Sequence, residues 1–252
     1  MLEYSLMSEI GDRKQNEDSV GMIQVENRYC FILADGLGGH GGGADASQMV
    51  VDCVKQIFEE KGEISQECMA ECFQRSQDLL LEEQQKQHRE NEMKTTLVIL
   101  MMDETKALWG HVGDSRLYVF EKGKYTFRTL DHSVPQMLVA SGEITEKEIR
   151  GHADRNRLLR VMGAEWNRPG YQISEERELT DGMSFLLCTD GFWELIEEKK
   201  MESAWKKAES PEEWIDLMRD QVKKKGAKTN MDNYSAIAVF IKEDKEDGSS
   251  SM

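Results

Sequence analysis

The chain of 252 residues carries a formal net charge of −16 and contains five cysteines and three prolines. Its acidic excess argues against nonspecific attraction to nucleic acid or to an anionic membrane surface, and it fits bound cations or a basic partner better. The chain start shows no secretory signal and no apolar run is long enough to span a membrane, so we expect a cytoplasmic protein without membrane contacts.

Cysteine usage and linker composition both bear on how the chain is organised. The five cysteines form no C-x-x-C pair and lie mostly within apolar segments, which predicts buried thiols in a reducing compartment. No proline-rich or serine-rich linker interrupts residues 1–242, so we expect a single catalytic domain there. Residues 243–252 are mainly acidic and serine residues, and we expect them to form a disordered tail.

The first third of the chain predicts strands followed by helices. Residues 2–10 and 19–26 alternate weakly between apolar and polar side chains, which predicts two strands. An apolar run over 29–34 predicts a buried third strand that ends on an acid. Apolar residues then recur at helical spacing over 46–57 and 69–80, which predicts two helices whose apolar faces pack into the core.

From residue 95 the apolar spacing changes to two. Four short segments predict a meander of strands, over residues 95–102, 107–112, 116–121 and 125–129. Ser133 with an early proline predicts the start of a short helix. The polar, glycine-rich residues 142–170 predict a long irregular segment, and such segments often carry function.

The remaining chain predicts strands near residues 171–177, 184–189 and 234–241, and Ser210 followed by proline predicts a helix before the last of them. Strands and helices do not alternate along the chain, which argues against a doubly wound parallel sheet. We therefore expect an α+β fold in which two antiparallel sheets form a β-sandwich with helices outside.

Four acids stand at ends of predicted strands beside glycine, serine or asparagine: Asp35, Asp114, Asp190 and Asp232. Gathered at one rim of a sandwich, their charges would repel one another and raise their pKa values. Bound cations would resolve that conflict, and an all-oxygen ligand set selects Mg²⁺, Mn²⁺ or Ca²⁺. Two such ions about 3.5–4 Å apart can lower the pKa of a shared water and orient a phosphoryl group.

Each of these residues also has a plainer interpretation. An Asp-Gly turn such as Asp35-Gly36 is common in structural loops, and Asp114 suits a turn cap. Arg13 offers the planar guanidinium that grips phosphate oxygens, or it pairs with Glu17. The order of the motifs along the chain decides between these interpretations.

That order resembles the metal-dependent (PPM, type 2C) serine/threonine protein phosphatase family, in its bacterial stand-alone branch. The resemblance spans residues 5–241 and is far more specific as an ordered set than in any single motif. The motifs, in chain order, are Arg13 with Glu17 and Asp18, Asp35-Gly36 with Gly38-Gly39-His40, Gly113-Asp114-Ser115-Arg116, Asp131-His132-Ser133, Thr189-Asp190-Gly191 and Asp232-Asn233.

The resemblance implies an α-β-β-α sandwich with a dinuclear metal site at one rim. It implies that Asp35 bridges two tightly bound Mn²⁺ or Mg²⁺ ions. The carbonyl of Gly36 and the carboxylates of Asp190 and Asp232 would complete the ligand set. Arg13 would bind the phosphate, and Arg13, Asp35 and Asp190 are the residues we expect to be catalytic.

Further roles follow from the same resemblance. Glu17 and Asp18 would hold metal-bound waters, and Asp114 with Asp190 would form a weaker third metal site. Residues 141–163 resemble the flap of the bacterial members, although Ala153 and Asp154 depart from the proline-containing pattern usual there. We interpret His40 and His132 as loop hydrogen-bonders, and Asp131 as a residue that fixes a turn.

We therefore expect hydrolysis of phosphoserine and phosphothreonine in proteins by direct attack of a metal-bridging hydroxide. The chain has no Cys-x5-Arg loop, which fits a reaction without a phosphoenzyme. Phosphoprotein substrates are the partners implied, and a cognate serine/threonine kinase is a further one. Two alternatives stay open: a catalytically inactive relative that acts as a regulatory binding module, and a hydrolase of a small phosphorylated metabolite.

Overall fold

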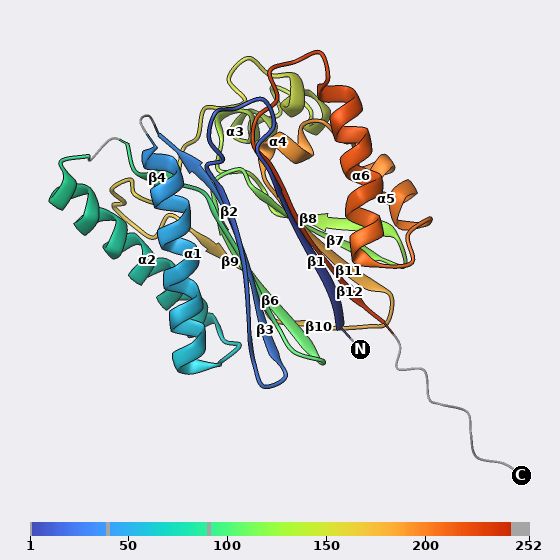
Figure 1. Ribbon diagram of the computed structural model, residues 1–252, viewed down its shortest axis with the longest axis horizontal. Coiled ribbons are helices and arrows are strands. Elements are labelled where there is room, and N and C mark those ends of the chain that lie inside the picture. The colour runs from blue at the N-terminus through green and yellow to red at the C-terminus, as the bar shows by residue number, and fades with distance from the viewer. Residues whose placement is uncertain (1, 39–40, 90–91, 243–252) are drawn as a thin grey trace, which may run out of the picture.

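The computed structural model describes residues 2–38, 41–89 and 92–242. Two antiparallel sheets pack face to face and helices cover the outer face of each, which gives the layers α-β-β-α (Figure 1). The predicted α+β sandwich is confirmed. The expected tail, residues 243–252, and the Gly39-His40 pair of the second motif lie outside the described residues.

The first sheet has five strands in the order β1-β12-β11-β7-β8. Both ends of the described chain pair here, because β1 runs antiparallel to β12 along its whole length. The strands are β1 (Leu2–Glu9), β12 (Tyr234–Ile241), β11 (Met183–Cys188), β7 (Arg116–Glu121) and β8 (Lys124–Arg128).

The second sheet has seven strands, with the order β10-β6-β5-β3-β2 and two short strands beside this path. The short strand β4 pairs with β3, and β9 pairs with β6. The strands are β10 (Arg177–Glu178), β6 (Lys106–Val112), β5 (Leu97–Met102), β3 (Arg28–Leu37), β2 (Asp18–Val25), β4 (Lys94–Thr95) and β9 (Gln172–Ile173).

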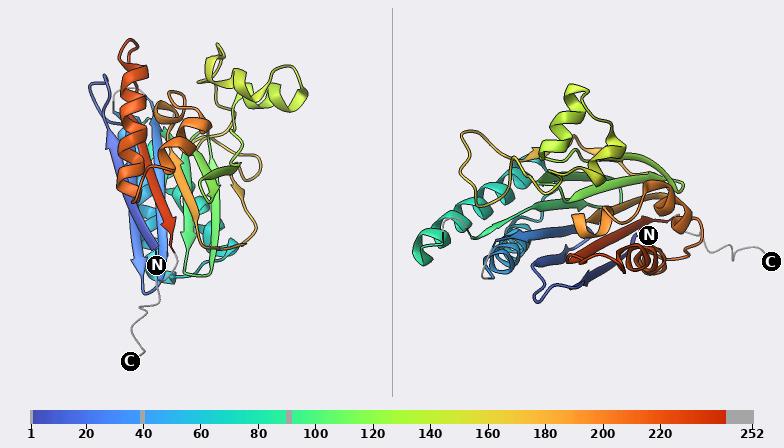
Figure 2. Two further views of the ribbon diagram at one scale, coloured as in Figure 1. Left: turned by 90° about the vertical axis from the view of Figure 1, so that its right-hand side faces the viewer. Right: turned by 90° about the horizontal axis from the view of Figure 1, so that it is seen from above.

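Helices lie on both outer faces and at one end of the sandwich. The long helices α1 (Gly42–Lys61) and α2 (Gln66–Gln87) cover the second sheet. On the first sheet lie α4 (Asp190–Trp193), α5 (Glu198–Trp205) and α6 (Pro211–Gly226). The helix α3 (Val134–Ser141) and the 3₁₀ helix η1 (Glu146–Gly151) stand out from one end of the sandwich (Figure 2).

The hydrophobic core has three layers, one between the sheets and one beneath each group of helices. Strand β3 shows why: Phe31 and Leu33 face the other sheet, whereas Ile32 and Ala34 face α1 and α2. Successive side chains of a strand point to opposite faces, so a strand buried on both faces is apolar throughout. All six residues of β5 are buried for the same reason.

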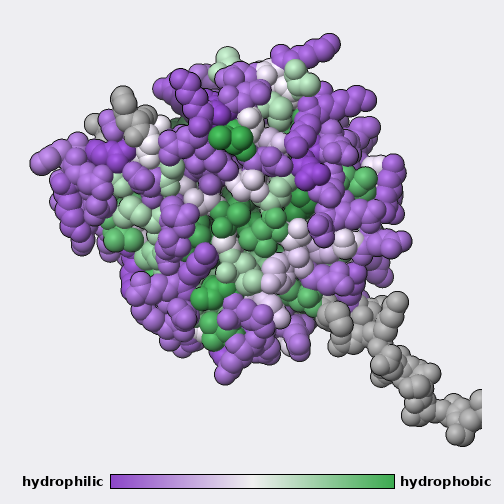
Figure 3. Space-filling view, viewed as in Figure 1, coloured by the Kyte–Doolittle hydropathy of each residue, from purple (hydrophilic) through white to green (hydrophobic). Residues whose placement is uncertain are grey.

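The outer surface is otherwise mostly hydrophilic. On the face shown in Figure 3, apolar residues gather along the strands between the two groups of helices. Leu6 of β1 and Val20 and Met22 of β2 pack there, partly buried, against the core between the sheets. Within the described residues, no helix is both long and apolar enough to cross a bilayer.

The predicted meander is wrong. Strands β5 and β6 are neighbours in the second sheet, whereas β7 and β8 are neighbours in the first, so the chain changes sheets between Val112 and Arg116. Gly113 has a φ of 100°, and a Cβ there would lie 2.5 Å from Cγ2 of Thr96. Glycine therefore allows the sharp crossing. Alternating apolar residues predict strands but do not assign them to a sheet.

Two smaller differences concern element ends. The third strand does not stop at Asp35: β3 continues to Leu37, because β4 pairs Thr95 with Gly36. The irregular segment contains η1, which a capping box between Thr145 and Glu148 begins. The strand predicted near residues 171–177 is instead two short strands, β9 and β10, separated by residues 174–176. The remaining strand and helix predictions are confirmed, including the N-cap at Ser133 and the last strand, and all five cysteines are free thiols.

Candidate active site

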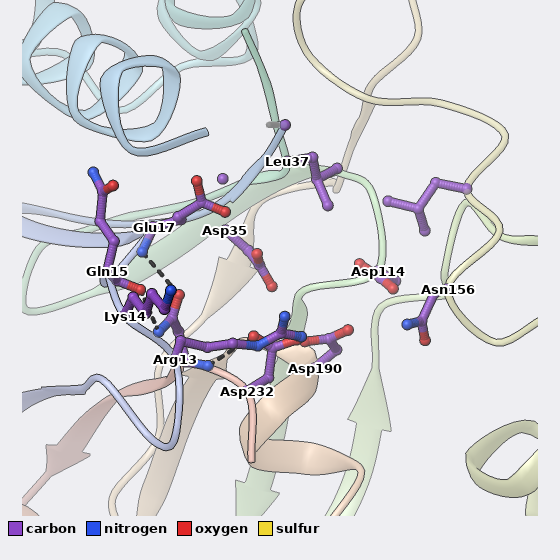
Figure 4. Close-up of a pocket in the computed structure, with 14 residues that line it drawn as sticks. Arg13, Lys14, Gln15, Glu17, Asp35, Leu37, Asp114, Asn156, Asp190 and Asp232 are labelled. Atoms are coloured by element: carbon purple, nitrogen blue, oxygen red, sulfur yellow. Dashed lines mark hydrogen bonds and ion pairs between the residues drawn. The ribbon is translucent and has the colours of Figure 1, made fainter. Parts of the chain in front are cut away.

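A pocket of about 340 Å³ opens at one end of the sandwich and is lined mainly by polar residues (Figure 4). Five of its lining residues are acids and two are cations. The acids are Glu17, Asp35, Asp114, Asp190 and Asp232, and the cations are Arg13 and Lys14. The remaining lining residues are Gln15, Gly36, Leu37, Gly38, Asn156, Leu158 and Asn233.

Both sheets supply acids to this pocket. Asp190 follows β11 as the first residue of α4, and Asp232 lies two residues before β12. Because β11 and β12 are antiparallel neighbours, these two side chains meet at one rim of the first sheet. Asp35 comes from β3 of the second sheet, and Asp114 lies in the crossing between the sheets. The side chains of all four point into the pocket (Figure 4).

Burial and mutual repulsion raise the pKa values of these carboxyls. The pKa of Asp35 is well above its usual range, first because of desolvation and then because of the charges of Asp18, Asp190, Asp114 and Asp232. The pKa of Asp114 is raised by burial and by the charge of Asp190. Burial and the charge of Asp232 raise the pKa of Asp190 to about 6, although a hydrogen bond with Asp35 opposes them.

Asp18 lies behind the pocket, directly across from Asp35 in the β2–β3 pairing. Its Oδ2 accepts hydrogen bonds from the hydroxyls of Ser235 at 2.7 Å and Thr189 at 3.0 Å. Its Oδ1 is buried and has no hydrogen-bond partner among the described residues. Burial raises the pKa of Asp18 to about 7, against the effect of the two hydroxyls.

The loop that carries Arg13 is fixed to the residues before β12. Asn233 uses its whole amide for this purpose: Nδ2 donates to the carbonyls of Ile10 at 2.8 Å and Gln15 at 3.0 Å, and Oδ1 accepts from the backbone of Glu17 at 2.8 Å. Gly11 has a φ of 61°, and a Cβ there would lie 2.2 Å from the Asp232 carbonyl oxygen. The Arg13 loop and the Asp232 segment therefore form one packed unit.

Within that unit the Arg13 guanidinium lies 2.7 Å from the Asp232 carboxylate (Figure 4). The alternative in which Arg13 pairs with Glu17 is not the arrangement found. Burial raises the pKa of Glu17, the charge of Asp232 raises it further, and the charge of Arg13 lowers it. Arg13 keeps 47% of its side chain exposed, so it is accessible to a ligand in the pocket.

The chemistry of the pocket fits hard divalent cations. The acidic side chains of the pocket offer only oxygen atoms as metal ligands. Several of these carboxyls have raised pKa values, which a bound cation would lower. The buried Oδ1 of Asp18 also accepts no hydrogen bond from any residue that the structure describes. Among residues 2–38, 41–89 and 92–242, however, no three Asp, Glu, His or Cys side chains already form a closed metal cage. The carboxylates therefore lie in one pocket, but they are not already arranged around a single metal position.

Asp131 and His132 of the fourth sequence motif do not line the pocket. Asp131 accepts two hydrogen bonds from the buried guanidinium of Arg116, at 2.8 and 2.6 Å, and therefore neutralises a buried cation. His132 accepts a hydrogen bond from the backbone of Gly113 at 3.2 Å and stacks on His111, which confirms its interpretation as a loop hydrogen-bonder. Burial lowers the pKa of His132 to about 3.

Several pocket residues were not singled out from the sequence. Lys14 and Gln15 line the pocket next to Arg13, and Asn156 and Leu158 reach it from the segment after η1. Asn156 lies within residues 141–163, whose resemblance to the flap of the bacterial members was the sequence signal that could have identified it.

Comparisons with known proteins agree with this geometry. The family model of protein phosphatase 2C matches residues 7–233. The serine/threonine phosphatase stp of Listeria welshimeri is 30% identical over 225 residues, which cover 87% of this chain and 88% of that protein. The serine/threonine phosphatase Stp1 from Staphylococcus aureus has a TM-score of 0.86 at 28% identity, with 96% of each chain covered.

A third match is to the catalytic domain of the serine/threonine protein phosphatase PstP, solved in complex with 2 manganese ions. Its TM-score is 0.80 at 24% identity, and the match covers 96% of this chain and 99% of that one, so it supports the fold. The family match begins within β1 and ends at the Asp232-Asn233 motif, so it includes every other described strand except β12. On this ground the chain belongs to the protein phosphatase 2C family.

Proposed function

We propose that this protein hydrolyses phosphoserine and phosphothreonine in proteins, with Mn²⁺ or Mg²⁺ bound in the pocket of Figure 4. The observation that carries the proposal is the meeting of five acids and Arg13 in one pocket of a chain of this family. The names of the relatives, serine/threonine phosphatases, support the substrate class. The relative solved with 2 manganese ions supports the choice of cofactor.

Two tightly bound ions would be held by the carboxylates of Asp35, Asp190 and Asp232 and by the carbonyl of Gly36. When bound, such ions lower the pKa of a water molecule and offset the negative charge of phosphoryl oxygens. Asp35 suits the shared position, since the charges of Asp18, Asp190, Asp114 and Asp232 all raise its pKa. Asp114 and Asp190 would hold a weaker third ion.

Arg13 would bind the phosphate. Its planar guanidinium presents several N–H donors in a fixed arrangement that matches phosphate oxygens. The contact with Asp232 orients this side chain toward the acids, and Asn233 fixes the loop that carries it. Arg13 would therefore hold the phosphate ester in place, while Asp35 and Asp190 would hold the ions that lower the pKa of water.

Glu17 and Asp18 would act on water around the ions. Asp18 has one buried oxygen without a donor, and a water molecule is a suitable donor for it. Ser235 and Thr189 hold the other oxygen, which keeps the carboxylate in one orientation. Glu17 lines the pocket directly, and its backbone carbonyl is held by the amide of Gly36 at 3.0 Å.

The setting of the enzyme is also part of the proposal. Phosphoproteins are the substrates, and a serine/threonine kinase that phosphorylates them is the partner whose action would be reversed. Free thiols and the absence of a membrane-spanning helix among the described residues support a cytoplasmic location. We assign the activity to a single domain over residues 1–242.

Hydrolysis of two esters tests this function: an aryl phosphate and a phosphothreonine peptide, each assayed with added Mn²⁺, with Mg²⁺ and with a chelator. The proposal predicts turnover of both with either metal and none with the chelator. Turnover that survives chelation would refute the role of the metals. No turnover with any metal would instead support the inactive binding module, against which the complete set of acids argues.

A further inference from the structure

Asp114 reaches the pocket from residues 113–115, which join β6 to β7 and belong to neither strand. Gly113 has a φ of 100°, so the backbone turns sharply just before the acid. The hydrogen bonds of a sheet do not fix such a connection, and its backbone groups need partners elsewhere. The position of the Asp114 carboxylate therefore depends on contacts from other parts of the chain.

Two such contacts hold the residues on either side of Asp114. The carbonyl of Gly113 accepts a hydrogen bond from the amide of His132 at 2.8 Å, and its amide donates to Nδ1 of the same residue at 3.2 Å. The hydroxyl of Ser115 lies 2.8 Å from the hydroxyl of Thr96, and both residues are buried. The two neighbours of Asp114 are thus fixed.

Asp114 itself is held by the indole of Trp193. Nε1 of Trp193 donates to the backbone carbonyl of Asp114 at 3.0 Å, and Trp193 is only 2% exposed. Trp193 ends α4, the short helix that begins at Asp190, and its amide donates to the carbonyl of Thr189 at 3.1 Å. One buried hydrogen bond therefore connects Asp114 to the helical turn that carries Asp190.

A buried cation in turn holds the indole. The guanidinium carbon of Arg116 lies over the Trp193 ring, 3.3 Å from its centroid. The guanidinium donates two hydrogen bonds to Asp131, and a third to the hydroxyl of Tyr118 at 3.0 Å. A cation–π contact is stronger when it is desolvated, and the Arg116 side chain is only 2% exposed. Asp131, Arg116 and Trp193 thus form one packed unit that ends on the Asp114 carbonyl.

A second buried indole has the same kind of hydrogen bond without an acid of the pocket at its other end. Trp214 of α6 is fully buried, and its Nε1 donates to the carbonyl of Met201 at 3.0 Å. Trp214 lies in the same apolar core over the first sheet as Trp193. Neither Trp214 nor Met201 is among the residues that line the pocket. Trp214 is therefore a matched control for the loss of a buried indole.

We propose that Trp193 is a positioning residue for the weaker third metal site, because its indole N–H sets the spacing of Asp114 and Asp190. Arg116 and Asp131 keep the indole in place. This inference rests on the proposed function, in which the two acids hold the third ion. A site with few protein ligands depends strongly on their spacing, since no other ligand compensates for a shift of either one. The inference also gives a role to Arg116 and Asp131, two motif residues that do not line the pocket.

The test measures how Mn²⁺ fills the protein, a quantity that does not depend on turnover. Electron paramagnetic resonance of free Mn²⁺ during a titration counts the bound ions and separates tight ions from weak ones. Trp193→Phe keeps an aromatic ring beside Arg116 but removes the N–H donor. It should raise the Kd of the weak ion about three- to tenfold, as expected for one lost hydrogen bond. The affinity for the two tight ions should stay the same.

Turnover of a phosphothreonine peptide gives a second measurement. The Mn²⁺ concentration that half-saturates this turnover should rise by the same factor in Trp193→Phe, and saturating Mn²⁺ should restore the wild-type kcat. Trp214→Phe should lower the melting temperature by a similar amount and change neither the titration nor the Mn²⁺ dependence. Arg116→Lys keeps the charge but loses the planar group, so it should shift the weak ion in the same direction. This variant also tests the inference if Trp193→Phe does not fold.

Three results for the variants would overturn the inference: a weak-ion Kd in Trp193→Phe like that of the wild type, an equal loss of affinity for all ions, or the same shift in Trp214→Phe. Each would mean that the indole only packs. A wild-type protein that binds two tight ions and no weaker one would also overturn it, while the proposed function would stand. A wild-type protein that hydrolyses neither ester would overturn the proposed function, and the Mn²⁺ titration would still decide whether Trp193 positions the weak site.

Discussion

Two parts of the pocket are built in different ways. We call the acids Asp35, Asp114, Asp190 and Asp232 the floor, and residues 152–158, which follow η1, the roof. The floor acids lie within or next to buried strands of both sheets, and hydrogen bonds from residues such as Asn233 and Thr189 hold the neighbouring backbone and side chains. The roof is a loop without regular structure, joined to the body at its ends and by the Arg155–Glu194 pair. The acids of the pocket are thus held by regular structure, whereas the loop over them is held at only a few points.

The largest expected effect comes from breaking the floor. Asp190→Asn keeps the shape of the side chain but removes a charge that the two proposed metal sites would share, so metal affinity and turnover should fall together. We expect kcat to drop by more than about 100-fold with the fold retained. Steady-state kinetics at saturating Mn²⁺, together with circular dichroism, measures this. Turnover like that of the wild type would refute the assignment of Asp190.

Arg13→Ala tests a pocket residue that would bind the phosphate rather than the metals. Loss of a charged hydrogen-bonding group costs roughly 1.5–3 kcal/mol, which corresponds to about ten- to a hundredfold in kcat/KM. Mn²⁺ affinity measured by calorimetry should be nearly unchanged, because the guanidinium does not ligate metal. A collapse of that affinity would show that Arg13 acts through Asp232, with which it pairs.

Asp114 and Asn156 line the same pocket (Figure 4). Asp114→Ala should leave the two tight ions in place and reduce turnover of a phosphopeptide about tenfold, because help for a poor leaving group is lost. An aryl phosphate has a better leaving group and should be affected less. Equal losses on both substrates would mean that Asp114 serves the tight ions. No loss, with a lower melting temperature, would mean that it only caps its turn.

The smallest expected effect concerns stability and pH. Folding raises the pKa values of Asp18 to about 7 and of Asp190 to about 6. The folded state therefore binds these protons more tightly than the unfolded chain does. Their contribution to stability is fully present below the unfolded pKa of about 4 and is lost as pH rises through 6 and 7.

The metal-free protein should therefore melt roughly 5 °C lower at pH 8 than at pH 5. Saturating Mn²⁺ should remove most of this difference, because bound cations favour the charged carboxylates. Asp18→Asn should flatten the metal-free profile, and differential scanning calorimetry across this pH range measures both. Identical pH profiles for Asp18→Asn and the wild type would contradict the burial argument.

Local chemistry made much of the fold predictable. The serines at positions 133 and 210 are N-caps, and the last strand runs over Tyr234–Ile241 as its apolar spacing indicates. These features depend on neighbouring residues alone. The change of sheet at Gly113 was not predictable, because it depends on which distant strands β6 and β7 pair with. The extension of β3 past Asp35 likewise depends on Thr95.

The candidate site was likewise predictable from the sequence in one part and not in the other. Asp35, Asp114, Asp190 and Asp232 carry strong local signals, since each stands beside glycine, serine or asparagine, just after an apolar run or, for Asp232, just before one. The roof has no such signal: Arg155 and Glu194 are 39 positions apart and meet only because the chain folds back over α4. The sequence also did not predict that Asp131 pairs with Arg116, because Arg116 begins β7 whereas Asp131 follows β8.

The central claim, that the floor acids hold the metals, is tested most directly by locating Mn²⁺ in crystals of the protein. Anomalous scattering at the manganese edge identifies the ion positions independently of any assumed ligand. The account predicts two strong peaks within the pocket, in contact with Asp35, Asp190 and Asp232. Peaks only outside this pocket, or a pocket without manganese at saturating concentration in an active protein, would contradict it.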